Sequence, residues 1–179
     1  MSIRVKLPDS ILNPFEYYQT SGSFHFPKLV LTSDTYVFDD ELSYNIDFSN
    51  TGESIVIRGC VKGSSTTECA RCLEEIIYEF NAEVEGLLLL EEDSELASDL
   101  AKDEFDILPK NLSIDIEPYL VSALVYNALD VPLCSVDCLG LCKLCGCNLN
   151  ERDCCCDKSE NNMEKSNPFE VLKSIKFSS

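Results

Sequence analysis

The sequence is poor in histidine, the side chain that acts most often as a general acid or base in catalysis. Its single histidine, His25, lies in an alternating Phe-His-Phe segment, where we expect a strand histidine that faces solvent or is hydrogen-bonded. One histidine is too few for the usual ligand set of a zinc hydrolase. A phosphate loop, a Gly-x-Ser-x-Gly elbow and a dinucleotide fingerprint are also missing. We therefore expect a protein that is not an enzyme.

Basic residues are scarce as well. The chain has 14 Lys and Arg against 32 Asp and Glu, a net charge of −18, and its basic residues form no block. Affinity for nucleic acid comes largely from Lys and Arg that neutralise phosphates, so non-specific phosphate binding is not expected. An acidic surface of this kind favours basic partners.

Long apolar runs are absent too. The longest aliphatic run, Leu87 to Leu90, is too short to cross a bilayer, and residues 1–9 lack the apolar core of a secretory signal. We expect a soluble, cytoplasmic protein that does not bind membranes. In a reducing cytosol, the 11 cysteines favour metal ligation over disulfide bonds.

Cysteine is the residue that the sequence has in excess, and it occurs in close pairs. Four thiolates suit the closed, tetrahedral coordination of a structural zinc ion, and pairs at short spacing can share one centre. The nearest pairing predicts a first zinc site from Cys142, Cys145, Cys154 and Cys156. A second site would use Cys69, Cys72, Cys134 and Cys138. An iron–sulfur cluster is the alternative metal group, but the spacings do not match the ferredoxin-type runs.

The rest of the chain predicts an α+β fold with an antiparallel sheet, open or curled toward a barrel, and one main helix. Strands are expected at 24–31, 36–48, 53–62 and 75–86, because alternating apolar residues are separated by turn residues. Asp115 can cap a helix that carries the apolar stripe Ile116, Leu120 and Leu124 and ends near Leu129.

We therefore predict three regions. Residues 1–132 form the core of sheet and helix, with an acidic loop at 91–106. Residues 133–157 form a cysteine-rich zinc module at the C-terminal side of this core. Residues 158–179 form a polar tail, in which Asn167 can cap a short helix.

Three segments of the chain resemble the YceD family of large ribosomal RNA subunit accumulation proteins. Cys69-Ala-Arg-Cys72-Leu is similar to the family's Cys-x-Arg-Cys-Leu element. The stretch from Cys138 to Asn150, followed by Cys154 to Cys156, is similar to its Cys-x-Gly-Leu-Cys-Pro-x-Cys-Gly-x-Asn-Leu-Asn element and closing Cys-x-Cys. Residues 167–172, Asn-Pro-Phe-Glu-Val-Leu, resemble its terminal Asp-Pro-x-x-x-x-Leu, with three residues in place of four between Pro168 and Leu172. The chain departs from the family at Lys143, which replaces the usual proline, and at Cys155, an additional thiol.

The resemblance implies a non-enzymatic factor for the accumulation of large-subunit (23S) ribosomal RNA and for ribosome assembly. The acidic composition is consistent with ribosomal proteins or assembly intermediates as partners, with ribosomal RNA bound indirectly or weakly. An alternative from a different class is a thiol-based redox or metal-sensing protein, because Cys60, Cys147 and Cys155 are left over after the two sites are assigned.

Overall fold

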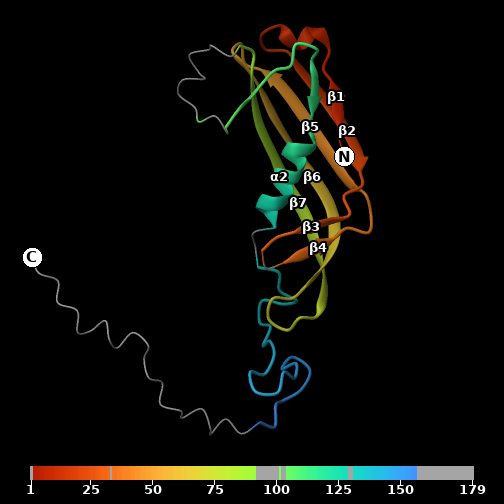
Figure 1. Cartoon of the computed structure of the whole chain (residues 1–179), viewed down its shortest axis with the longest axis vertical. Helices are drawn as coiled ribbons and strands as arrows, with labels where there is room; N and C mark the ends of the chain where they lie inside the picture. The colour runs from red at the N-terminus through yellow and green to blue at the C-terminus, as the bar shows by residue number, and fades with distance from the viewer. Residues whose placement is uncertain (1, 33, 92–100, 102–103, 129–130, 157–179) are drawn as a thin grey trace, which may run out of the picture. The chain divides into compact units, whose positions relative to one another are not determined.

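The computed structural model describes residues 2–32, 34–91, 101, 104–128 and 131–156 (Figure 1). The chain divides into two compact units, Met1–Cys138 and Leu139–Ser179. Most of the predicted acidic loop at 91–106, the predicted tail at 158–179 and its short helix lie outside the described residues. Within the described part, no helix is both long and apolar enough to cross a membrane.

The first unit is built around an open, mostly antiparallel sheet, with one α-helix among its described residues. The elements in chain order are β1 (Arg4–Lys6), the 3-10 helix η1 (Asp9–Leu12), β2 (Tyr17–Phe24), β3 (Lys28–Val30), β4 (Thr35–Val37), β5 (Leu42–Asn50), β6 (Ser54–Glu68), β7 (Glu75–Leu89), β8 (Asp106–Ile107), β9 (Ser113–Asp115) and α2 (Glu117–Asn127). The large sheet has the order β2-β5-β6-β4-β3, with β7 on the other edge of β6 and β8 beyond β7, while β1 and β9 form a separate pair. The predicted antiparallel sheet with one main helix is confirmed. The outermost of the described strands do not pair with one another, so the sheet is not a closed barrel.

The longest strands, β6 and β7, form the centre of the sheet. They pair antiparallel without interruption from Glu68↔Glu75 to Ser54↔Leu89. On its other edge β6 pairs first with β5 and then, at Thr66, with β4. A Cβ atom at Gly59 would lie 2.1 Å from the Asn45 carbonyl oxygen of β5, so only glycine allows this close approach.

Side chains of β7 alternate between core and solvent. Phe80, Ala82 and Val84 are buried, and the residues between them are exposed. This is the alternation that the sequence predicted for the segment, because successive side chains of a strand point to opposite faces.

Two of the predicted strands are interrupted in the structure. The segment 24–31 breaks at residues 25–27 between β2 and β3, because proline cannot donate a hydrogen bond to a central ladder, so His25 is exposed but lies outside both strands. The segment 36–48 breaks at residues 38–41, where Phe38 and three consecutive acidic residues connect β4 to β5. Strand β6 instead continues beyond its predicted end at Lys62 to Glu68.

Helix α2 covers the buried face of the sheet (Figure 1). Leu120 and Leu124 are fully buried, and the ring of Tyr119 lies so close to Gly86 that a Cβ atom there would be 2.6 Å from it. The hydroxyl groups of two core tyrosines donate hydrogen bonds to the end of the helix. Tyr78 bonds the Asn127 carbonyl at 3.1 Å, and Tyr36 bonds the Ala128 carbonyl at 3.3 Å. These bonds fix the point at which the chain leaves α2 toward the cysteines.

The start of α2 is held by Asp115. The N-cap position is Ile116, one residue after the predicted cap. The Asp115 carboxylate accepts hydrogen bonds from the Ser2 hydroxyl at 2.7 Å and from the backbone N–H groups of Ile3 at 3.1 Å and Glu117 at 3.2 Å. The Ser2 bond, together with the backbone bonds, holds the pKa of Asp115 below its usual value although partial burial opposes this.

We predict that Asp115→Asn lowers the free energy of unfolding at neutral pH by about 1 kcal/mol, the usual size of a lost helix-cap interaction. Because the pKa of Asp115 is depressed in the folded chain, its stabilising contribution is present above the pKa of an unfolded aspartate, about 3.9. It is lost as the pH falls through the lower folded value. Urea unfolding of both chains across this range should therefore give a stability difference that shrinks on acidification. A difference that does not change with pH would contradict the assignment.

Candidate metal centres

The first candidate centre begins in the turn that joins β6 to β7. Cys69 is the first residue after β6, and its N–H donates to the Glu74 carbonyl at 2.8 Å. The Leu73 N–H donates back to the Cys69 carbonyl at 2.9 Å, and Leu73 has a φ of 59°. This left-handed residue reverses the chain within a few residues. The tight reversal brings the Cys69 and Cys72 thiols to the same side of the turn.

The other half of this centre comes from the segment that follows α2. The Ala70 N–H donates to the Pro132 carbonyl at 2.9 Å, and the Arg71 guanidinium donates to the Cys138 carbonyl at 3.0 Å. Two residues of the β6–β7 turn thus hold the segment that carries Cys134 and Cys138. All four cysteines belong to the first compact unit.

The four thiols of the first centre lie at distances that suit one metal ion. The Sγ atoms of Cys69 and Cys138 are 3.8 Å apart, and those of Cys72 and Cys134 are 3.5 Å apart. All four Sγ atoms lie within 4.8 Å of one another. Four sulfur ligands about 2.3 Å from a central zinc ion would be separated by about 3.8 Å, so this group can hold a metal ion of that kind. None of the 11 cysteines forms a disulfide bond.

Burial makes the ionisation of these thiols depend on a cation. Cys69, Cys72 and Cys138 are all at most 4% exposed. Burial opposes the Cys69 thiolate, but backbone hydrogen bonds from Cys72, Cys134 and Arg71 outweigh it and lower its pKa to about 6. The Glu74 backbone bond favours the Cys72 thiolate, yet burial and the neighbouring thiols raise its pKa to about 12. Without a cation one thiolate forms at the expense of the others, because like charges this close cannot all ionise.

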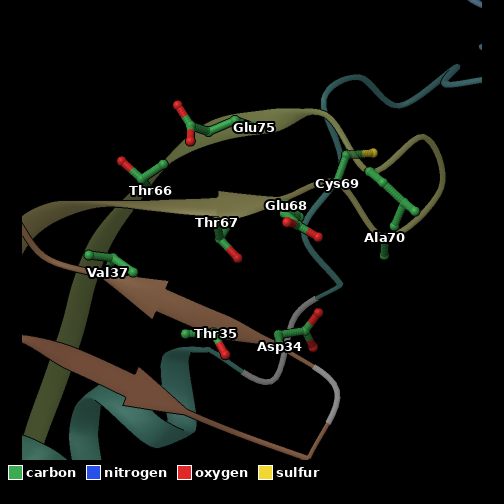
Figure 2. Close-up of a pocket in the computed structure, with 10 residues that line it drawn as sticks. Asp34, Thr35, Val37, Thr66, Thr67, Glu68, Cys69, Ala70 and Glu75 are labelled. Carbon is green, nitrogen blue, oxygen red and sulfur yellow. The ribbon is translucent and has the colours of Figure 1, made fainter.

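A hollow of about 520 Å³ lies beside the first centre. Figure 2 shows it between the end of β6 and strand β4, with Thr35 and Val37 on one side and Thr66 to Cys69 on the other. Glu68 and Glu75, which also line it, are cross-strand partners in the β6–β7 ladder. Like charges at opposite positions destabilise a ladder, so a cationic group from outside would relieve this pair.

The second candidate centre is a small hairpin within the second unit. The Cys142 N–H donates to the Cys147 carbonyl, and the Gly146 N–H donates to the Cys142 carbonyl, both at 2.8 Å. Gly146 has a φ of 71°, which a glycine adopts without the steric cost that other residues meet. The turn from Cys142 to Cys147 therefore closes on itself and directs its thiols inward.

Two asparagines brace this hairpin. The Leu139 N–H donates to the Asn150 side-chain oxygen at 2.7 Å, and the Asn150 side-chain amide donates to the Asn148 side-chain oxygen at 2.8 Å. Leu141 and Asn148 also form an antiparallel bridge. The Asn-Leu-Asn segment, which the sequence identified only as part of a motif, therefore has a structural role.

The structure brings together Cys142, Cys145, Cys147 and Cys154 in the second centre, with Sγ atoms within 4.8 Å of one another. The Cys154 Sγ lies 3.2 Å from that of Cys142 and 3.5 Å from that of Cys145. Cys156, the fourth ligand in the set predicted from the sequence, is not in this group. It nevertheless lies beside the group: its N–H donates to the Cys154 sulfur at 3.3 Å, and the Cys154 and Cys145 thiols raise the pKa of its own thiol, so five thiols compete for four coordination positions. Which of Cys147 and Cys156 completes the set stays a prediction.

Both centres contain the same backbone hydrogen bond to sulfur, which stabilises thiolates. The N–H of the residue two positions after a cysteine points at its sulfur, from Arg71 to Cys69 at 3.5 Å, from Leu144 to Cys142 at 3.4 Å and from Cys156 to Cys154 at 3.3 Å. Hydrogen bonds to the charged form lower a pKa.

The thiol pKa values of the second centre diverge as they do in the first. The Cys147 backbone N–H and the Cys154 thiol lower the pKa of Cys145 to about 6. Contact with Cys145 raises the pKa of Cys147 to about 11, and contact with Cys154 raises that of Cys156 to about 12. A divalent cation would reverse this pattern by favouring the deprotonated form of every ligand.

Sequence spacing alone did not reveal two residues that support these centres. Arg71 carries the hydrogen bond between the β6–β7 turn and the Cys138 segment, and its position inside a Cys-x-Arg-Cys element is the only sequence signal for this role. Cys147 was left over when thiols were assigned by pairs, because it lies two residues from Cys145 and has no close partner after it. Its place becomes evident only when the hairpin closes.

We predict that the purified chain binds about two zinc ions and that Cys138→Ser retains about one. The matched control is Cys60→Ser, which removes a thiol of β6 that belongs to neither group and should leave the metal content unchanged. Metal analysis of protein purified without chelator measures both. Cys138→Ser should also lose at least about 3 kcal/mol of unfolding free energy, because structural zinc contributes ~10–16 kcal/mol at such sites. Equal metal contents in all three proteins would refute the first centre.

We further predict that Cys147→Ser weakens metal binding at the second centre by more than about tenfold, and that Cys156→Ser has a smaller effect, because the Cys147 sulfur belongs to the compact group. Competition with a chromogenic chelator measures both affinities. The opposite order would restore the ligand set that the sequence predicted.

Comparison with known proteins adds one finding to this geometry. Searches of curated proteins and of solved structures returned no match to the chain. A family model described as "Large ribosomal RNA subunit accumulation protein YceD" matches residues 57–176, more than half of the chain. The match begins in β6 and includes every cysteine of both candidate centres. The chain therefore belongs to the YceD family.

Proposed function

We propose that this protein is a non-enzymatic, zinc-stabilised cytoplasmic factor required for the accumulation of large-subunit (23S) ribosomal RNA and for ribosome assembly. Family membership is the observation that carries the proposal. On this view, zinc ions occupy both thiol groups, and the protein acts through ribosomal proteins or assembly intermediates.

The chemistry of the candidate centres supports a structural role for the metal. Four thiolates around a zinc ion leave no coordination position open for water or substrate, as structural zinc sites require. In the first centre, a metal ion would connect the β6–β7 turn, with Cys69 and Cys72, to the segment after α2, with Cys134 and Cys138. Metal binding would then contribute to the stability of the unit.

Charge supports a protein partner over naked RNA. The chain carries a net charge of −18, which repels a phosphate backbone and attracts basic proteins. Many ribosomal components are basic, and an acidic factor can hold such a protein until the RNA displaces it. The hollow lined by Glu68 and Glu75 offers one place where a basic side chain would be stabilised.

The proposal predicts that cells lacking the gene have a reduced ratio of large-subunit to small-subunit ribosomal RNA. The wild-type chain and Cys60→Ser should restore the ratio, whereas Cys72→Ser, which removes a ligand of the first centre, should fail to restore it. Quantitative electrophoresis of total RNA from cells with matched protein levels measures this. A normal ratio in cells without the gene would count against the function itself.

A second candidate function, a thiol-based redox or metal sensor, is favoured by the five thiols around the second centre. A sensor would release metal when mild peroxide oxidises its thiolates, whereas a closed structural site should resist. Thiol titration and metal release in the presence and absence of peroxide distinguish the two functions.

A further inference from the structure

One edge of strand β7 is available for pairing with another chain. Along its full length β7 pairs with β6, but on its other edge it pairs only through Leu88 and Leu89, with β8. In the described part of the chain, the segment from Glu75 to Leu87 therefore has no strand beside it. An edge of this kind presents a row of backbone donors and acceptors.

The register determines which backbone groups point outward. At one end of the β6–β7 ladder the Cys69 N–H donates to the Glu74 carbonyl, and at the other end the Leu90 N–H donates to the Glu53 carbonyl. Both pairs continue the register of the ladder. Hydrogen-bonded pairs alternate with non-bonded ones in an antiparallel ladder, so the even-numbered residues of β7 bond β6. The odd-numbered residues direct their N–H and C=O groups to the outer edge. The bond from Leu108 to the Leu89 carbonyl on that edge agrees with this assignment.

The same odd-numbered residues have exposed side chains, and most of them are acidic. They are Glu75, Ile77, Glu79, Asn81, Glu83 and Glu85. On β6, Glu79 faces Ser64 and Glu83 faces Cys60, so neither has a basic residue directly opposite, whereas Glu85 faces Arg58 and Asn81 faces Lys62. Helix α2 lies on the other, buried face of β7 (Figure 1), and these side chains are exposed.

This charge pattern selects the occupant of the edge. A second copy that paired antiparallel along β7 would place glutamates opposite glutamates, which destabilises the pairing. An RNA strand would bring its phosphates beside the same carboxylates. An extended basic segment would instead place Lys or Arg directly opposite Glu79 and Glu83, where opposite charges stabilise a ladder. The exposed Ile77 adds an apolar contact on the same face, with 75% of its side chain accessible.

We propose that the outer edge of β7, from Ile77 to Glu85, binds an extended basic segment of a partner protein as an additional strand. Backbone hydrogen bonds to the odd-numbered residues supply affinity, and the glutamates select basic side chains. The inference rests on the proposed function for the nature of the partner, a basic protein, and adds the place and the mode of binding.

The test uses the full-length, metal-loaded chain and a labelled peptide as long as Glu75–Glu85, in which lysine alternates with threonine. We expect the peptide to bind with an affinity that falls as salt rises, because the pairs are exposed. On binding, amide hydrogen exchange should slow by about tenfold or more at Ile77, Glu79, Asn81 and Glu83, whose N–H groups point outward. The neighbouring even-numbered amides already bond β6 and should change little.

Two variants separate strand pairing from general charge attraction. Asn81→Pro removes one outward N–H without removing a bond to β6 and should weaken peptide binding about fivefold to tenfold. Asn81→Thr keeps the N–H and should bind within about twofold of wild type. Glu79→Gln together with Glu83→Gln should weaken binding and flatten its salt dependence, while the β6–β7 amides stay protected.

Unchanged exchange at the four outward amides, or equal peptide affinity for Asn81→Pro and Asn81→Thr, would overturn the inference. If Asn81→Pro disturbs folding, the inference is still tested by peptide binding and amide hydrogen exchange of the Glu79→Gln, Glu83→Gln double variant. A labelled uridine oligonucleotide that protects the same amides would also overturn the choice of a protein partner. The ratio of large-subunit to small-subunit ribosomal RNA in cells lacking the gene is a separate measurement. It can depend on the protein even if the β7 edge does not bind a basic segment.

Discussion

The antiparallel ladder between β6 and β7 is the constraint on which the rest of the first unit depends. Its pairing runs from Ser54↔Leu89 to Glu68↔Glu75, so the register is set over the whole length of both strands. The register places Phe80 and Val84 in the core beneath α2. It also ends in the turn that presents Cys69 and Cys72 to the segment after α2. A slip by one residue would expose the core face and misplace the turn together, because side chains alternate with a period of two.

The sequence predicted the β6–β7 ladder well where the alternation of apolar and polar residues was regular. In β7 every second residue is apolar, so the buried face could be assigned residue by residue. The continuation of β6 to Glu68 was not predicted, because its last third is built from small polar residues. Ser65 and Thr67 are nevertheless buried there, with at most 4% exposure, since the neighbouring strands and not their own polarity determine their environment. The local sequence does not indicate this burial, because it depends on strands that are far away along the chain.

The candidate metal centres also have one part that the sequence predicted and another that only the structure shows. Spacing alone predicted that Cys69 and Cys72 would act as a pair, and the structure places them in one turn with Cys134 and Cys138 nearby. Spacing alone did not separate Cys147 from Cys156, because both lie a short distance from the other thiols along the chain. The path of the hairpin places the Cys147 sulfur in the compact group. That path depends on Gly146 and on the two asparagines, whose hydrogen bonds the cysteine spacing does not encode.

The charges of the chain connect these observations. A four-thiolate zinc centre carries a charge near −2, so metal binding adds to an already acidic protein instead of neutralising it. A divalent cation in each thiol group would offset the repulsion among the thiolates at short range, where solvent screens least. The glutamates of β7 are exposed, and among Glu79, Glu83 and Glu85 only Glu85 has a basic residue, Arg58, directly opposite on β6. If the proposals hold, a metal ion would supply the positive charge at the thiol centres, whereas at Glu79 and Glu83 it would come from solution or from a partner. The β7 edge, and not the thiol centres, would then be the surface suited to binding a basic protein.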